Sequence, residues 1–98
     1  MIRVILPVYL QRLANTGREI ELDIEGVFTY ENLLDILELK YPMLQGTIRD
    51  HNTKERRPYL RFFACGEDFS HSDLNSNLPE DVINGKQPFR IVGAMSGG

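Results

Sequence analysis

Hydrophobic and polar residues alternate without a break from Glu19 to Glu25. Every second position carries an aliphatic side chain, and the positions between and around them carry carboxylates. Successive side chains of a β-strand point to opposite faces of the sheet, so this pattern predicts an antiparallel strand with one buried and one solvated face. This stretch is the clearest structural signal in the chain.

The N-terminal stretch 2–10 is rich in β-branched and aliphatic residues, and it predicts a strand that pairs with 19–25 in a hairpin. Pro7 lacks a backbone N–H, so we expect a bulge or an unpaired position there. Residues 15–18 have turn-forming composition and would connect the two strands. The expected core-facing positions of the first strand are Val4, Leu6, Val8 and Leu10.

A helix is predicted to begin at Thr29, whose hydroxyl can accept a hydrogen bond from a free N–H group of the first turn. Glu31 lies in that turn, where the helix dipole favours negative charge. Pro42 ends the helix because its ring clashes with the preceding turn. The polar stretch Arg49–Pro58 has no periodicity and predicts a surface loop. The apolar residues at helical spacing, expected against the sheet, are Leu33, Leu34, Leu37 and Tyr41.

The second half of the chain predicts strands at Tyr59–Cys65, Phe69–Ser70 and 88–92, with 78–83 filling the core from a turn. The resulting order, β-β-α-β-(β)-β, predicts an α+β domain in which a mixed sheet packs on one main helix. That order fits the β-grasp topology. We expect one domain over residues 1–93 and a flexible tail over residues 94–98.

Composition and charge narrow the class of protein. The chain has 98 residues, enough for one domain, and 42% of them are apolar, which argues against disorder. A net charge of −3 offers no basic stripe for nucleic acid, and no apolar run approaches the roughly 20 residues of a membrane span. His51 and His71 lack ligand spacing, so no metal site is expected. The lone Cys65 is expected to be a small core residue of a strand. These features predict a soluble, cytoplasmic protein with no nucleic-acid or membrane partner.

From Phe63 onward, the sequence resembles the MoaD/ThiS family of ubiquitin-like sulfur carriers. The matching elements are an aromatic-x-x-Gly-x-Asp run at 63–68, Leu78-Pro79, a polar glycine turn at 84–86, the strand 89–92 and the final Gly97-Gly98. The N-terminal hairpin and the helix at Thr29 match as well, so the resemblance covers nearly the whole chain. The length and the loop at 49–58 are more similar to the longer carriers of the CysO type, which serve cysteine biosynthesis.

Three departures from the family pattern leave the acceptor of the sulfur open. Cys65 stands where asparagine is common, Lys86 where aspartate is common, and 93–95 where many members carry Pro-Pro-Val. The diglycine end is unaffected by these differences.

The resemblance implies a carrier protein, not an enzyme, although such a chain can be the small subunit of a synthase. An E1-like adenylyltransferase would use ATP to activate Gly98, with Gly97 beside it, and a sulfur donor would convert the end to a thiocarboxylate. The acceptor would be the large subunit of molybdopterin synthase, a thiazole synthase or a cysteine synthase. The resemblance implies no cofactor bound to the carrier itself.

Physical chemistry supports a reactive role for this end of the chain. A terminal carboxylate has a pKa of about 3.3–3.7, so at neutral pH it is ionised and needs a leaving group before it can be attacked. Six residues from Gly93 to Gly98 extend about 20 Å, far enough to enter a buried nucleotide site. Gly97 and Gly98 lack Cβ atoms, which lets the backbone approach closely and take unusual φ values.

The residues expected to contact the activating enzyme are Val92, Met95, Ser96 and Phe62. Apolar residues beside a free tail have no obvious core to fill, which favours this role for Met95 and Val92. Val92 fits equally well as an ordinary residue of the last strand. Two other functions stay open: a protein modifier conjugated through Gly98 to lysines, and a non-covalent β-grasp interaction module.

One basic cluster predicts either a solvated loop or a docking site for an acidic surface. Its members are Lys54, Arg56, Arg57 and Arg61.

Overall fold

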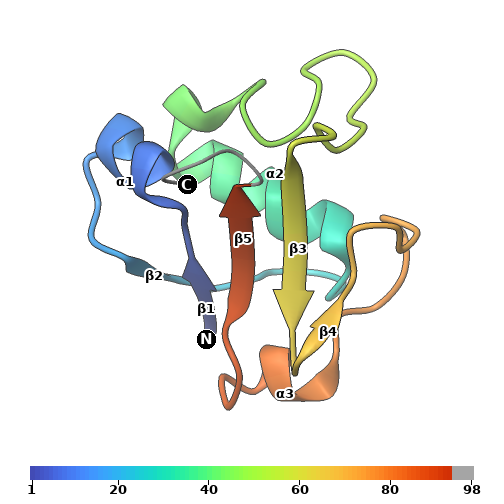
Figure 1. Ribbon diagram of the computed structural model, residues 1–98. Helices are drawn as coiled ribbons and strands as arrows, with labels where there is room; N and C mark the ends of the chain where they lie inside the picture. Colours follow the sequence, from blue (N-terminus) through green and yellow to red (C-terminus); the bar gives the residue numbers. More distant parts are fainter. Residues whose placement is uncertain (94–98) are drawn as a thin grey trace.

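The computed structural model describes residues 1–93, in which five strands form one mixed sheet of order β2-β1-β5-β3-β4. β1 and β5 are parallel neighbours at its centre, and the other pairs are antiparallel (Figure 1). The α+β class and the mixed sheet predicted from the sequence are confirmed. The strands are β1 (Ile2–Ile5), β2 (Glu19–Leu22), β3 (Leu60–Ala64), β4 (Glu67–Asp68) and β5 (Phe89–Gly93).

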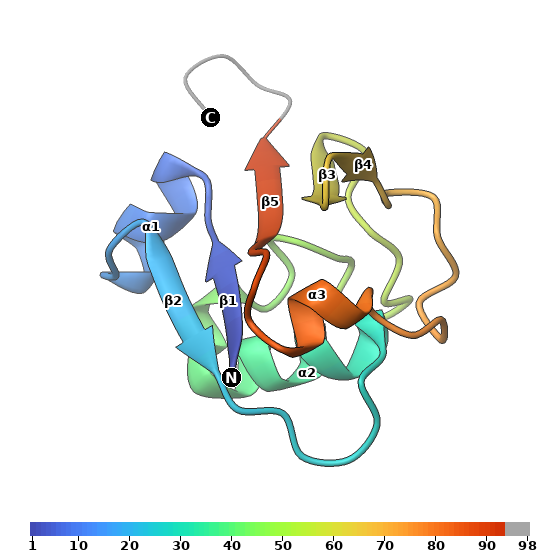
Figure 2. The same cartoon turned by 90° about the horizontal axis from the view of Figure 1, so that it is seen from below.

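Helix α2 (Tyr30–Lys40) lies across one face of the sheet, as Figures 1 and 2 show. The Thr29 side chain accepts from the backbone N–H of Asn32, so the predicted N-cap is confirmed. The short 3₁₀ helix η1 (Pro42–Leu44) follows after Pro42 has ended α2. The core between helix and sheet includes Leu33, Leu34 and Leu37, each at most 1% exposed.

The prediction of a strand over residues 2–10 is wrong beyond Ile5. Helix α1 (Val8–Ala14) follows instead, and Pro7 is its N-cap residue with φ −65°. Proline lacks a backbone N–H, but the first N–H groups of a helix have no partner within the helix, so proline costs nothing at this position. The Pro7 carbonyl accepts hydrogen bonds from the backbone N–H groups of Leu10 and Gln11. Val8 is therefore 44% exposed instead of core-facing, although β1 and β2 still pair as predicted.

The stretch 49–58 was predicted to be a surface loop, but its first residue, Arg49, is buried and attaches the loop to α2. Arg49 is 1% exposed, and its Nε donates to Glu38 Oε2 at 2.7 Å. Its Nη2 bonds Asp35 as well. Burial acts to lower the pKa of Arg49, but the hydrogen bonds to Glu38 and Asp35 outweigh it and raise that pKa above its ordinary value. Arg49 is thus a charged side chain inside the fold.

The expectation that Cys65 is a core residue is also wrong. Cys65 and Gly66 form the two-residue turn between β3 and β4, with φ of 53° and 77°, and Cys65 is exposed. The fourth strand accordingly occupies Glu67–Asp68, not Phe69–Ser70. Helix α3 (Glu80–Ile83) then contributes the buried Val82 to the core, in the region where a plug was expected.

Candidate functional site

The candidate site is the end of the sheet from which residues 94–98 continue. β5 brings the chain to Gly93 between two neighbouring strands: Ile5 of β1 is the partner of Arg90, and Leu60 of β3 is the partner of Gly93. Phe89 and Ile91 point into the core and are at most 2% exposed. The first half of β5 is therefore paired on both edges, whereas Gly93 is held by its pairing with β3.

The predicted site residues divide into three groups. Gly97, Gly98, Met95 and Ser96 lie outside the described residues, so their roles stay predictions. Val92 is 37% exposed on β5, directly before Gly93. Phe62 is 1% exposed, and its ring lies 5.4 Å from that of Phe89 between centroids. Phe62 is a core residue with no surface to offer a partner, so that assignment is corrected.

An apolar groove of about 310 Å³ lies beside β5 at this end of the sheet. The N-terminus of α1 forms one wall, where the Gln11 side chain donates to the Leu6 carbonyl at 2.7 Å. The other wall belongs to β5. Arg18 is the one ionisable residue among those that line the groove, so the groove can accept an apolar side chain beside one cation. Its lining consists of Ile5, Leu6, Pro7, Val8, Gln11, Arg18, Ile91 and Val92.

Two tyrosines add half-exposed aromatic surface near the groove. Tyr9 follows Val8 on α1, Tyr59 precedes the first residue of β3, and their side chains are 37% and 39% exposed. Partial burial, and then the nearby Tyr59 phenol, raise the pKa of Tyr9 above its usual value of 10. This end of the sheet therefore presents apolar and aromatic surface around β5.

The histidines, the cysteine and the basic cluster singled out in the sequence lie elsewhere in residues 1–93. Among these residues, no group of three histidine, cysteine, aspartate or glutamate side chains is arranged to hold a metal ion. Much of the basic cluster holds the loop: Arg56 donates to the carbonyls of Ser70 and Leu60, and Arg57 to that of Gly46. No helix within the same range is long and apolar enough to cross a membrane.

Comparison with solved structures decides the fold. No family model matches the chain, and no curated protein matches it. SAMP1 from Haloferax volcanii is similar over 98% of this chain and 97% of its own, with a TM-score of 0.73 and 21% identity. The Amycolatopsis orientalis BexX/CysO complex contains a chain that is similar over the full length of both, with a TM-score of 0.74 and 15% identity. This chain has the β-grasp fold.

A third β-grasp structure gives the same result. Mycobacterium tuberculosis CysO has a TM-score of 0.74 and 16% identity, over 97% of this chain and all of its own. The resemblance seen in the sequence is thus supported by structures that match nearly from end to end.

The groove wall that α1 contributes to this β-grasp domain was not predicted from the sequence. The available signal was the spacing of Leu10 and Ala14, four residues apart and both buried, which is typical of one helix face after Pro7. The β-branched residues up to Val8 concealed it.

Proposed function

We propose that this protein is a ubiquitin-like sulfur carrier, and that the carboxylate of Gly98 is its reacting group. The observation that carries the proposal is the combination of a β-grasp fold with a Gly97-Gly98 end that starts from the central strand β5. Neighbours of this fold include CysO and SAMP1, which supports the class of carrier or modifier.

The proposed chemistry takes place on the partner enzyme. A carboxylate oxygen of Gly98 attacks the α-phosphate of ATP, and pyrophosphate leaves. A sulfur nucleophile from a donor then attacks the acyl-adenylate carbon, and AMP leaves with its pair of bonding electrons. When the nucleophile is hydrosulfide, loss of its proton leaves a thiocarboxylate at the end of the chain. When the nucleophile is a persulfide, the product is an acyl disulfide, and a reducing thiol must cleave its S–S bond, forming a disulfide with the donor. The thiocarboxylate can then pass sulfur to an acceptor.

Tail length determines where an E1-like adenylyltransferase has to bind. Five residues beyond Gly93 reach at most about 17 Å, so the nucleotide site must come within that distance of the end of β5. The enzyme therefore contacts the surface around Gly93, where Val92, Tyr59 and the α1 groove provide apolar area. We assign this surface, in place of Phe62, as the docking site.

The test is a reaction with ATP, a cognate adenylyltransferase and a sulfur donor, followed by intact-protein mass spectrometry. The expected product is heavier by the difference between sulfur and oxygen. A variant lacking Gly97 and Gly98 is the matched control and should stay unmodified. An unchanged mass of the full chain with its cognate enzyme would contradict the proposal, and full cellular function of the truncated variant would favour an interaction module.

A protein modifier is the second candidate, because two of the similar structures are described as small archaeal modifier proteins. Its chemistry begins with the same activation but ends with an isopeptide bond between Gly98 and a lysine of another protein. Trypsin cleaves after Arg90, so the expected remnant on a modified lysine is residues 91–98. Branched peptides with this remnant in a cellular digest, lost when Gly97 and Gly98 are deleted, would establish this role.

The proposed acceptor enzyme is a molybdopterin synthase large subunit, a thiazole synthase or a cysteine synthase. Similarity to CysO makes cysteine synthase the first to test. Sulfur transfer from the purified thiocarboxylate to each acceptor in turn would identify the pathway.

A further inference from the structure

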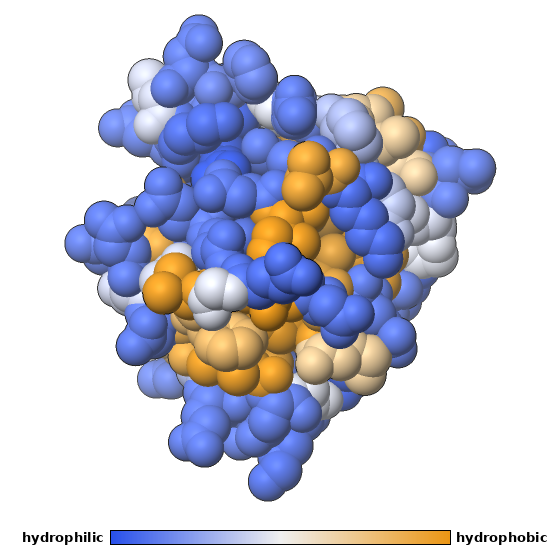
Figure 3. All heavy atoms as spheres, turned by 180° about the vertical axis from the view of Figure 1, so that it is seen from behind, coloured by the Kyte–Doolittle hydropathy of each residue, from blue (hydrophilic) through white to orange (hydrophobic). Residues whose placement is uncertain are grey.

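A second apolar surface lies on the side of the molecule that carries α2. Figure 3 shows apolar side chains gathered on this face and surrounded by hydrophilic ones. Leu39 is 80% exposed, Val27 is 65% exposed, and Ile36 is half-buried. We call these three residues the α2 patch. None of them lines the groove beside β5.

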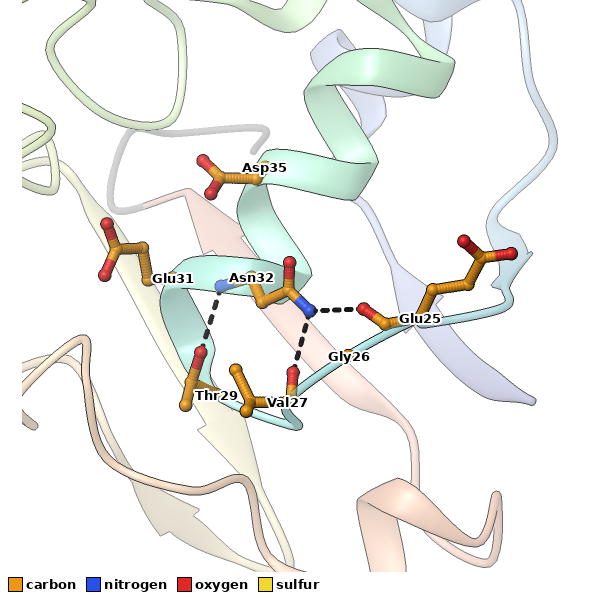
Figure 4. Close-up of a pocket in the computed structure, with 7 residues that line it drawn as sticks. All are labelled: Glu25, Gly26, Val27, Thr29, Glu31, Asn32 and Asp35. Carbon is orange, nitrogen blue, oxygen red and sulfur yellow. Dashed lines mark hydrogen bonds between the residues drawn. The ribbon is translucent and has the colours of Figure 1, made fainter.

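The α2 patch spans two adjoining depressions, one along the helix and one at the loop before it. Ile36 and Leu39 line a depression together with Asn32 and Glu25, and Val27 lines an adjoining depression that includes the same Asn32 and Glu25. The Asn32 amide fixes this junction, since it donates to the carbonyls of Glu25 and Val27 at 2.9 and 2.7 Å (Figure 4). The surface is therefore held in place by hydrogen bonds to the loop backbone.

Carboxylates border the α2 patch. Figure 4 shows Glu25 on one side of Asn32 and Glu31 with Asp35 on the other, and Asp23 lines the depression at Leu39. Asp35 bonds Arg49, whereas no ion pair is present for Asp23, Glu25 or Glu31 within residues 1–93. Most of the bordering charge is therefore negative and uncompensated.

The lysine at the end of α2, Lys40, already makes a hydrogen bond to the sheet. Lys40 Nζ donates to the Glu21 carbonyl on the edge strand β2 at 3.0 Å. This contact covers a backbone acceptor of the sheet edge, so pairing of an added strand with β2 is disfavoured there.

The charges select one kind of occupant. A second copy of the chain would bring the same carboxylates against these, and an anionic lipid surface or nucleic acid would be repelled. A segment with apolar side chains between lysines or arginines complements both the patch and its border. We propose that the α2 patch binds a partner protein through such a basic, apolar segment, independently of the surface around Gly93.

The proposal is tested with the full chain labelled with ¹⁵N and a synthetic amphipathic peptide. The peptide has leucines at every third or fourth position and lysines elsewhere, and its companion has glutamate in place of each lysine. The lysine peptide should shift the NMR signals of Val27, Asn32, Ile36 and Leu39, more strongly at low salt because the bordering charges are exposed. The glutamate companion should produce no such shifts.

Two matched variants locate the contact. Leu39→Ser should weaken peptide binding about tenfold, since an apolar side chain buried at the contact is lost. Leu13→Ser removes another exposed leucine, 48% exposed on α1, and should leave the affinity unchanged. Thermal unfolding of both variants should match the unaltered chain, because both side chains are at the surface.

Several results would overturn the proposal. These are absence of binding, shifts confined to other surfaces, equal affinity for the glutamate companion, or no loss of affinity in Leu39→Ser. Concentration-dependent self-association through the same signals would assign the surface to a second copy instead. Deletion of Gly97 and Gly98 should leave peptide binding intact, so this experiment is independent of the sulfur-carrier test.

Discussion

Replacement of Arg49 by methionine is expected to be among the most damaging single substitutions outside the apolar core. The guanidinium is 1% exposed and bonds Glu38, whose side chain is itself only 6% exposed. Methionine fills much of the same volume but leaves the Glu38 carboxylate buried without its cation. Breaking a buried pair in this way costs about 3–5 kcal/mol. A domain of this size has about 5–15 kcal/mol of stability, so the loss would range from about a fifth of it to all of it.

Removal of both partners should cost much less than removal of one. In the double variant Arg49→Met, Glu38→Met no buried charge remains, and Asp35 is 53% exposed and stays hydrated. Paired replacement of a buried ion pair by apolar residues is often neutral, so we expect the double variant within about 2 kcal/mol of the unaltered chain. Arg49 Nη1 also has no hydrogen-bond partner among residues 1–93, and this buried unpaired donor reduces the net stabilisation that the ion pair gives.

The assay is urea unfolding at pH 7 for the unaltered chain, the two single variants and the double variant, because guanidinium salts would screen the charges. The double-mutant cycle gives the coupling energy directly. The reasoning is refuted if Arg49→Met lowers the free energy of unfolding by less than about 1 kcal/mol. It is also refuted if the loss in the double variant equals the sum of the losses in the two single variants.

Four further outcomes are expected. Gly85→Ala should lower the free energy of unfolding, measured with heat or urea, by about 1–3 kcal/mol, because Gly85 has φ +83° and a Cβ would lie 3.0 Å from the Met1 carbonyl oxygen. Gly66→Ala is the control: Gly66 has φ +77°, but a Cβ there would meet open space, so the loss should be smaller. Phe62→Ala should lose about 3–5 kcal/mol of stability, whereas a docking residue would alter activation alone. Val92→Ser should slow adenylation while the melting temperature stays the same, which activation kinetics and calorimetry together would check. Hydrogen bonds from the side chain and the backbone N–H of Ser70 lower the pKa of Asp68 from its ordinary value of 3.8. The ionised carboxylate therefore stabilises the fold above about pH 4, and this stabilisation is lost as the pH falls through the lowered pKa of the folded state. Asp68→Asn should flatten that acid limb of the stability curve, and an equally steep limb would exclude Asp68 as its source.

The elements that the sequence predicted well are those determined by local patterns. The alternation that begins at Glu19 correctly predicted the buried face of β2, although the strand ends at Leu22 and not at Glu25 as expected. The Thr29 hydroxyl correctly marked the start of α2. Both signals lie within a few positions of the feature that they determine. The last strand was similarly marked by β-branched residues, and its predicted end at Val92 is one residue short of the observed end at Gly93.

The errors involve contacts between residues distant in sequence, or a shift of register. Arg49 was predicted to be a loop residue because its partners, Glu38 and Asp35, lie on α2, 11 and 14 positions earlier in the chain. Phe62 and Phe63 are adjacent in one strand, and only the register of β3 decides which of them is buried. Cys65 lies in the turn for the same reason. The site at the end of β5 stays a prediction. The groove beside β5 depends on α1, whose buried Leu10 and Ala14 have helical spacing that the β-branched residues up to Val8 concealed.

The central place of β5 has a consequence for biosynthesis. This strand is translated after the other four, yet it occupies the position between β1 and β3 in the finished sheet. While the ribosome is still adding residues 89–93, β1 and β3 have no neighbour on their facing edges, and Gly93 has no fixed position. An activating enzyme that recognises this end of the sheet would therefore distinguish completed, folded copies from nascent or unfolded ones. Under the proposed function, only folded chains would then be loaded with sulfur.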